Sequence, residues 1–103
     1  MQRRREPRYR VSESIVLSMI EGREAKYSAA MLVDISRTGC RIVSALELAV
    51  GAEVLFTLNS VAVAGRVRYC ESAADSFAAG VEITNIAGGV AARADLISGC
   101  DSW

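Results

Sequence analysis

The sequence contains no histidine. Histidine is the usual general base beside a serine or cysteine nucleophile, and it is the commonest metal ligand in proteins. Its absence argues against the Ser-His-Asp and Cys-His classes of enzyme and against the usual metal sites. No two acidic residues stand in a context that indicates acid–base catalysis by a carboxylate pair. We therefore expect a protein that is not an enzyme and that needs no metal or cofactor.

Cysteine is scarce, and long apolar runs are missing. Cys40, Cys70 and Cys100 are an odd number at wide spacing, without the Cys-x-x-Cys pair typical of zinc sites. No apolar run approaches the roughly 18 residues that a membrane helix needs. The charged N-terminus is not followed by the apolar segment of a signal peptide. These absences predict a reduced, cytoplasmic protein with no membrane span.

Net charge is zero, because twelve basic residues balance twelve acidic ones. The balance is not local. Residues 1–10 hold five arginines and one glutamate, a net charge of +4, whereas residues 11–103 hold seven basic and eleven acidic residues, a net charge of −4. A basic arm on an acidic body indicates a local preference for anions rather than a general nucleic-acid surface.

Short stretches rich in β-branched and apolar residues recur at intervals of about 8–12 residues, which predicts an all-β barrel or sandwich. The expected strands are residues 11–20, 25–34, 39–44, 53–58, 61–70 and 77–84. Alternation in the fifth strand places Val67 and Tyr69 on one face and Arg66, Arg68 and Cys70 on the other. Arg66 and Arg68 either extend a basic site or form the exposed face of a half-buried strand, and the second interpretation is favoured.

The chain length fits one domain. Residues 1–10 show no periodicity and are expected to form a flexible basic arm. Residues 11–87 are expected to form the β-barrel, with residues 71–76 as a loop between its last two strands. The stretch VAARADLI within residues 88–103 favours a short helix followed by a tail.

Two short motifs stand out against this background. The arm contains RRREPR, and the segment after the second expected strand contains DISRTG. Each motif alone is short enough to occur by chance, but together they come in a defined order around the first two strands. Their key positions are Arg3, Arg4, Arg8, Asp34, Ser36 and Gly39.

With both motifs present, the sequence resembles the PilZ domain family of bacterial receptors for cyclic di-GMP. The family pattern is RRxxxR near the N-terminus followed by (D/N)xSxxG, and the stretches FAAGVEIT and LELAVGAEVLFTL also look like parts of such domains. The resemblance covers about residues 3–87. It implies a six-stranded antiparallel PilZ-type β-barrel. It also implies a receptor that changes its interaction with a downstream protein in motility, adhesion or exopolysaccharide control.

The chemistry of cyclic di-GMP, with two phosphates and two guanines, suits these residues. A guanidinium can bind phosphate through two hydrogen bonds, contact guanine O6 and N7, or stack on a base. Asp34 can accept from guanine N1 and N2, while Ser36 offers a hydroxyl that can also brace the turn. Gly39 either takes a positive-φ conformation or lets a ligand approach the backbone. The resemblance assigns ligand contacts to Arg3, Arg4, Arg8, Asp34 and Ser36, with Gly39 shaping the loop.

Two other functions stay open at this point. The basic arm could bind nucleic acid weakly, which predicts a steep salt dependence. The acidic body and the lack of an aromatic strip on one strand face disfavour this alternative. The chain could also be a PilZ-like adaptor that binds proteins but no nucleotide, in which case Arg4→Ala would change nothing.

Overall fold

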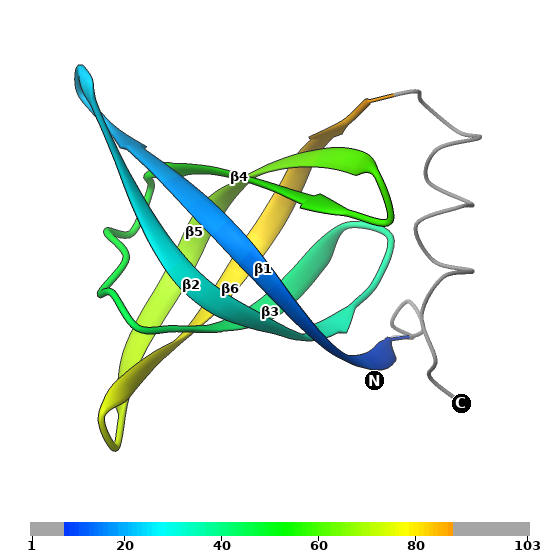
Figure 1. Cartoon of the computed structure of the whole chain (residues 1–103), viewed down its shortest axis with the longest axis horizontal. Coiled ribbons are helices and arrows are strands. Elements are labelled where there is room, and N and C mark those ends of the chain that lie inside the picture. The colour runs from blue at the N-terminus through cyan, green and yellow to red at the C-terminus, as the bar shows by residue number, and fades with distance from the viewer. Residues whose placement is uncertain (1–7, 88–103) are drawn as a thin grey trace, which may run out of the picture.

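Six antiparallel strands form the protein: β1 (Tyr9–Glu21), β2 (Glu24–Ile35), β3 (Gly39–Ser44), β4 (Glu53–Leu58), β5 (Val61–Ala73) and β6 (Ser76–Ile86). They close into a barrel in the order β1-β2-β3-β6-β5-β4 (Figure 1). The computed structural model describes residues 8–87, and residues 1–7 and 88–103 lie outside the described residues. The predicted all-β, six-stranded antiparallel barrel is confirmed. Most of the expected arm and the whole expected C-terminal helix or tail fall outside this range.

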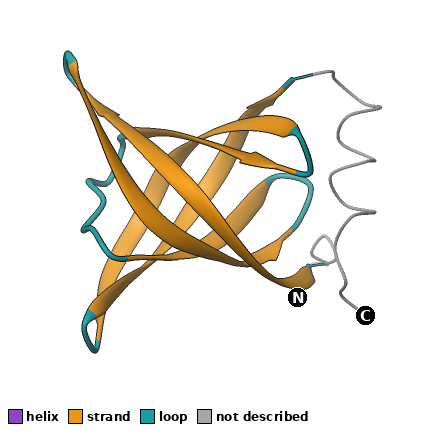
Figure 2. Ribbon diagram, in the orientation of Figure 1, coloured by secondary structure: helices purple, strands orange, loops and turns teal. Residues whose placement is uncertain are grey.

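The barrel interior is filled by aliphatic side chains that alternate with outward-facing residues. In β4, for example, Val54, Phe56 and Leu58 are buried and the residues between them are exposed. The connection 45–52 between β3 and β4 is a loop (teal in Figure 2), and its Leu48 side chain adds to this core. Each fully buried side chain of this size contributes about 1.5–3 kcal/mol, so this core is the main source of stability. Within residues 8–87, no helix is long and apolar enough to cross a membrane.

The last two strands are longer than the sequence pattern indicated. Residues 71–76 were expected to form a loop, but Ser72 pairs with Phe77 and Ala73 pairs with Ser76. Only residues 74 and 75 make the turn, with Ala74 at a positive φ of 57°. Paired strand residues can be as polar as loop residues when both faces are exposed, which is why composition suggested a loop here.

A β-bulge in β5 overturns one expectation about side-chain direction. Val67 pairs with Val81 and Tyr69 pairs with Gly80, so Arg68 is an extra residue in the ladder. The alternation predicted Tyr69 beside Val67 and Cys70 on the opposite face. Because the bulge shifts the register, Tyr69 instead faces outward and is 41% exposed, while Cys70 packs against the core.

Candidate functional site

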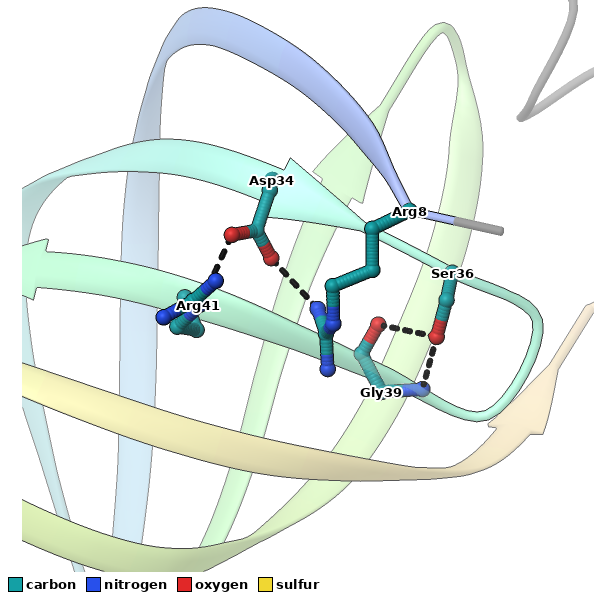
Figure 3. A network of polar contacts seen from close by, with 5 residues as sticks. All are labelled: Arg8, Asp34, Ser36, Gly39 and Arg41. Atoms are coloured by element: carbon teal, nitrogen blue, oxygen red, sulfur yellow. Dashed lines mark hydrogen bonds and ion pairs between the residues drawn. The ribbon is translucent and has the colours of Figure 1, made fainter. Parts of the chain in front are cut away.

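Asp34 is the centre of a polar network on the outer face of the barrel. Its Oδ1 accepts a hydrogen bond from Arg8 Nη1 at 2.5 Å, and its Oδ2 accepts one from Arg41 Nε at 2.7 Å (Figure 3). The Asp34 side chain is only 11% exposed, whereas those of Arg8 and Arg41 are 43% and 53% exposed. Both contacts are charge-assisted hydrogen bonds, the stronger class of such bonds. One nearly buried carboxylate therefore holds two guanidinium groups near the surface.

A second bulge explains why Asp34 faces outward. Leu32 pairs with Ile42 and Asp34 pairs with Arg41, so Val33 is an extra residue in β2. Strict alternation would point Asp34 in the same direction as Leu32, which is fully buried. The bulge turns the carboxylate to the outer face, where the arginines lie. Bulges recur beside functional sites because they redirect a side chain in this way.

The turn between β2 and β3 is braced by Ser36. Its backbone N–H donates to the Gly39 carbonyl at 2.8 Å, and its hydroxyl donates to the same oxygen at 3.2 Å while accepting from Gly39 N–H at 3.3 Å. The Ile83 N–H donates to the Thr38 carbonyl at 2.8 Å, which fixes the turn against β6. Ser36 is 4% exposed, so its hydroxyl serves the shape of the turn in this structure.

Gly39 does not have the positive φ that one interpretation predicted. Its backbone is extended as part of β3, opposite Glu82 of β6. A Cβ at this position would lie 3.1 Å from the Val81 carbonyl oxygen and 3.7 Å from Arg8 Nη2. Glycine is therefore favoured here by the close approach of β6 and of the Arg8 side chain.

A hollow of about 330 Å³ lies beside this network, over the outer faces of β3, β6 and β5. Its lining includes Arg8, Arg41, Arg68, Tyr69, Gly80 and Glu82. Arg68 Nη1 donates to Glu82 Oε1 at 2.7 Å across its rim. Three guanidinium groups face two carboxylates when Asp34 is included, so the hollow carries a net positive charge. This arrangement favours an anionic ligand.

The floor of the hollow and the adjoining Asp34 lie on one row of paired residues across four strands. Asp34 of β2 is opposite Arg41 of β3, which is opposite Gly80 of β6, which is opposite Tyr69 of β5. A Cβ on Gly80 would lie 2.7 Å from Tyr69 Cζ, so the ring occupies the space that a side chain at Gly80 would fill. The ring thereby provides a partly exposed aromatic surface beside the arginines.

Comparison with known proteins identifies the family to which the chain belongs. The sequence model of the PilZ domain matches residues 2–100. The chain belongs to the PilZ domain family. A solved structure with the same fold is a Bacillus subtilis inhibitor of motility (MotI/DgrA), with a TM-score of 0.65 and 18% sequence identity. The match covers 95% of this chain and 49% of that protein, so the chain spans about half its length. A search of curated proteins found no match.

The structure brings together some of the predicted PilZ site residues and leaves others outside its range. Arg8 of the first motif and Asp34 of the second are bound to each other, although 26 positions separate them. Ser36 and Gly39 form the adjoining turn. Arg3 and Arg4 lie outside the described residues. Whether any of these residues contacts a ligand stays a prediction.

Three residues that line the hollow of this PilZ domain were missed by the sequence reasoning: Arg41, Tyr69 and Gly80. Arg41 carried a usable signal, because Cys40 and Ile42 beside it read as inward-facing, which leaves Arg41 outward next to the Gly39 turn. Tyr69 carried none, since alternation placed it on the wrong face. Of the two arginines left open, Arg68 lines the hollow, whereas Arg66 is exposed and is not part of that lining.

Cys40 lies under the site but cannot act as a nucleophile near neutral pH. Burial, and secondarily the charge of Asp34, raise the pKa of its thiol to about 12. A thiol rather than a thiolate is therefore present, and the thiolate is the reactive form. Within residues 8–87, no group of three or more Cys, Asp or Glu residues is placed to hold a metal ion.

Proposed function

We propose that this PilZ domain is a receptor for cyclic di-GMP that couples binding of the second messenger to a changed interaction with a partner protein. The observation that carries the proposal is the meeting of the two motifs. Arg8 and the Asp34–Gly39 turn join at one positively charged hollow. The proposal describes a bacterial, cytoplasmic receptor without enzymatic activity and without a cofactor.

The residues of the hollow complement the parts of this ligand. Arg8, Arg41 and Arg68 supply guanidinium groups for phosphate oxygens or for the O6 and N7 edge of guanine. Tyr69 supplies a ring on which a base can stack, an interaction worth about 1–3 kcal/mol. The volume of about 330 Å³ is at the lower end of the range for ligand pockets. Arg3 and Arg4 are then expected to cover the part of the ligand that projects from the hollow.

The arm is the element expected to respond to the ligand. Ordering its backbone costs of order 1–2 kcal/mol per residue. Charge-assisted hydrogen bonds contribute about 1.5–3 kcal/mol each, so several are needed to offset this cost. Arg3, Arg4 and Arg8 together can supply them, whereas one arginine cannot. The ordered arm and its ligand would present a new surface to the partner protein.

The downstream partner is expected to act in motility, adhesion or exopolysaccharide control. The structural neighbour MotI/DgrA is described as an inhibitor of motility. Its fold matches this chain, which makes swimming motility the first phenotype to examine in a strain that lacks this protein. A partner would be sought by affinity capture with and without cyclic di-GMP, and capture that depends on the ligand would support the coupling.

Isothermal titration calorimetry tests ligand binding directly. Cyclic di-GMP is titrated into the wild type, Arg8→Ala and Arg66→Ala, with GTP as the control ligand. We expect Arg8→Ala to weaken binding at least about tenfold, or about 1.4 kcal/mol. Arg66→Ala, a change at an exposed arginine outside the hollow, should have little effect. No heat with cyclic di-GMP, or equal heat with GTP, would contradict the proposal.

Two alternatives make different predictions in the same experiments. Weak nucleic-acid binding by the arm predicts steep salt dependence and no preference for a cyclic dinucleotide. A protein-binding adaptor that ignores nucleotides predicts that Arg4→Ala changes neither partner capture nor the motility phenotype. The positive hollow with an exposed ring favours the nucleotide receptor over both.

A further inference from the structure

Arg41 lies outside both sequence motifs, yet it occupies a central place at the hollow. It sits on β3 between Asp34 of β2 and Gly80 of β6, its paired neighbours on either side. Its side chain lines the hollow and is 53% exposed. Gly80 has no side chain, so the space on that side of Arg41 is open except for the Tyr69 ring that reaches over from β5.

The way in which Arg41 is held leaves most of its donors available. Asp34 Oδ2 engages Nε at 2.7 Å, and no other polar contact within residues 8–87 holds this side chain. A guanidinium has five N–H donors, so among residues 8–87 the four on its two Nη atoms have no hydrogen-bond partner. The Asp34 contact already restricts the rotamers of Arg41. Arg41 therefore loses less side-chain entropy on binding a ligand than an arginine without a partner would lose.

Asp34 orients two guanidinium groups toward the same hollow. Its other oxygen binds Arg8, so the three side chains form a bridge of one negative and two positive charges. The bridge keeps a net charge of +1 and is anchored by its nearly buried carboxylate. Such pre-organisation raises affinity, because less conformational freedom is lost when the ligand arrives.

We propose that Arg41 is a further ligand-binding residue that donates to a phosphate of the cyclic dinucleotide, and that Asp34 is the positioning residue that aims it. This inference rests on the proposed receptor function and deepens it. Arginine from the arm and arginine from the barrel would then bind the ligand from two directions. Cyclic di-GMP has two phosphates, so each direction has its own acceptor.

Calorimetric titration of the full-length chain with cyclic di-GMP tests the role of Arg41. Arg41→Ala should weaken binding about tenfold, as expected for a lost charge-assisted contact. Arg41→Lys, which keeps the charge but not the planar fork, should recover part of this loss. Arg66→Ala is the matched control, since it removes an exposed strand arginine that does not line the hollow. Its binding should stay within about twofold of the wild type.

The outcomes separate this inference from the proposed function. If the wild type binds, Arg8→Ala weakens binding and Arg41→Ala behaves like Arg66→Ala, the role of Arg41 is overturned while the receptor function stands. If the wild type does not bind, both are overturned. Thermal unfolding of each variant accompanies the titrations, and Arg41→Ala should still unfold cooperatively, a few degrees below Arg66→Ala, because Asp34 loses one charge-assisted partner but keeps its contact with Arg8.

A double-mutant cycle tests the positioning role of Asp34. Asp34→Asn keeps the size of the side chain but removes the charge that holds Arg41. If Asp34 aims Arg41, then Arg41→Ala should weaken binding less in the Asp34→Asn background than in the wild type. Equal losses in both backgrounds would overturn the positioning role. A merely structural role for Asp34 would lower the unfolding temperature without changing the effect of Arg41→Ala.

Discussion

Gly80→Ala should weaken ligand binding by at least as much as it weakens the fold. The added Cβ would lie 2.7 Å from Tyr69 Cζ, so the ring must leave the floor of the hollow. The ring is 41% exposed and has solvent on one side, so it can swing outward without moving the backbone. Base–aromatic stacking is worth about 1–3 kcal/mol, which predicts about 5- to 150-fold weaker binding of cyclic di-GMP.

The effect of Gly80→Ala on stability should be small. Exposing about 100 Å² of the Tyr69 ring would cost at most about 2.5 kcal/mol. Replacing glycine by alanine restores about 0.4–1 kcal/mol through the lower entropy of the unfolded chain. A tilted ring keeps part of its contacts, so we expect a net loss of about 1 kcal/mol in the free energy of unfolding.

Gly65→Ala is the matched control, because it should damage the fold instead. A Cβ there would lie 2.5 Å from Val81 Cγ1 and 2.7 Å from the Glu82 carbonyl oxygen, which is backbone and cannot swing away. Gly65 is buried, so overpacking should cost about 1–3 kcal/mol. Urea denaturation measures this loss, which should be at least as large as the loss in Gly80→Ala.

The assay is calorimetric titration of the wild type, Gly80→Ala, Tyr69→Ala and the double variant. If the ring is the target of the added methyl group, Gly80→Ala should have no further effect on affinity in the Tyr69→Ala background. Unchanged affinity in Gly80→Ala, in a wild type that binds, would refute the argument. So would additive losses in the double variant, since the methyl group would then act on something other than the ring.

Two further predictions concern charges at the site. Glu82→Gln removes a carboxylate from the rim of the hollow and frees Arg68. It should therefore tighten cyclic di-GMP binding about two- to fivefold. Weaker binding in the titration would contradict a net electrostatic role for the rim. The thiol of Cys40 has a pKa of about 12 against 9.0 for an unperturbed cysteine. A raised pKa means that the unfolded chain loses this proton first, so the stability contributed is complete below about pH 9 and is lost as pH rises toward 12. Urea denaturation should therefore show a shallower decline above pH 9 in Cys40→Ala, and an identical slope would disprove this linkage.

The alternating pattern predicted the all-β class and the number of strands because a half-buried strand requires a period of two. The expected strands 39–44 and 53–58 agree with β3 and β4 at both ends. Both are short and lie close to turn residues such as Gly39, Gly51 and Asn59, so the pattern had little room to err. The boundary between β5 and β6 was wrong, because exposed paired residues and loop residues have similar compositions.

The candidate site likewise combines features that the sequence predicts with features that only the structure shows. By itself, the sequence determined the two motifs, the charge of the arm and the location of a braced turn after the second strand, because these depend on residues close together in the chain. Only the tertiary structure decided that Arg41, Gly80 and Tyr69 form one floor. That depends on β6 lying between β3 and β5 and on two bulges that turn Asp34 and Tyr69 outward. A bulge is a property of two paired strands, so no single strand's alternation can reveal it.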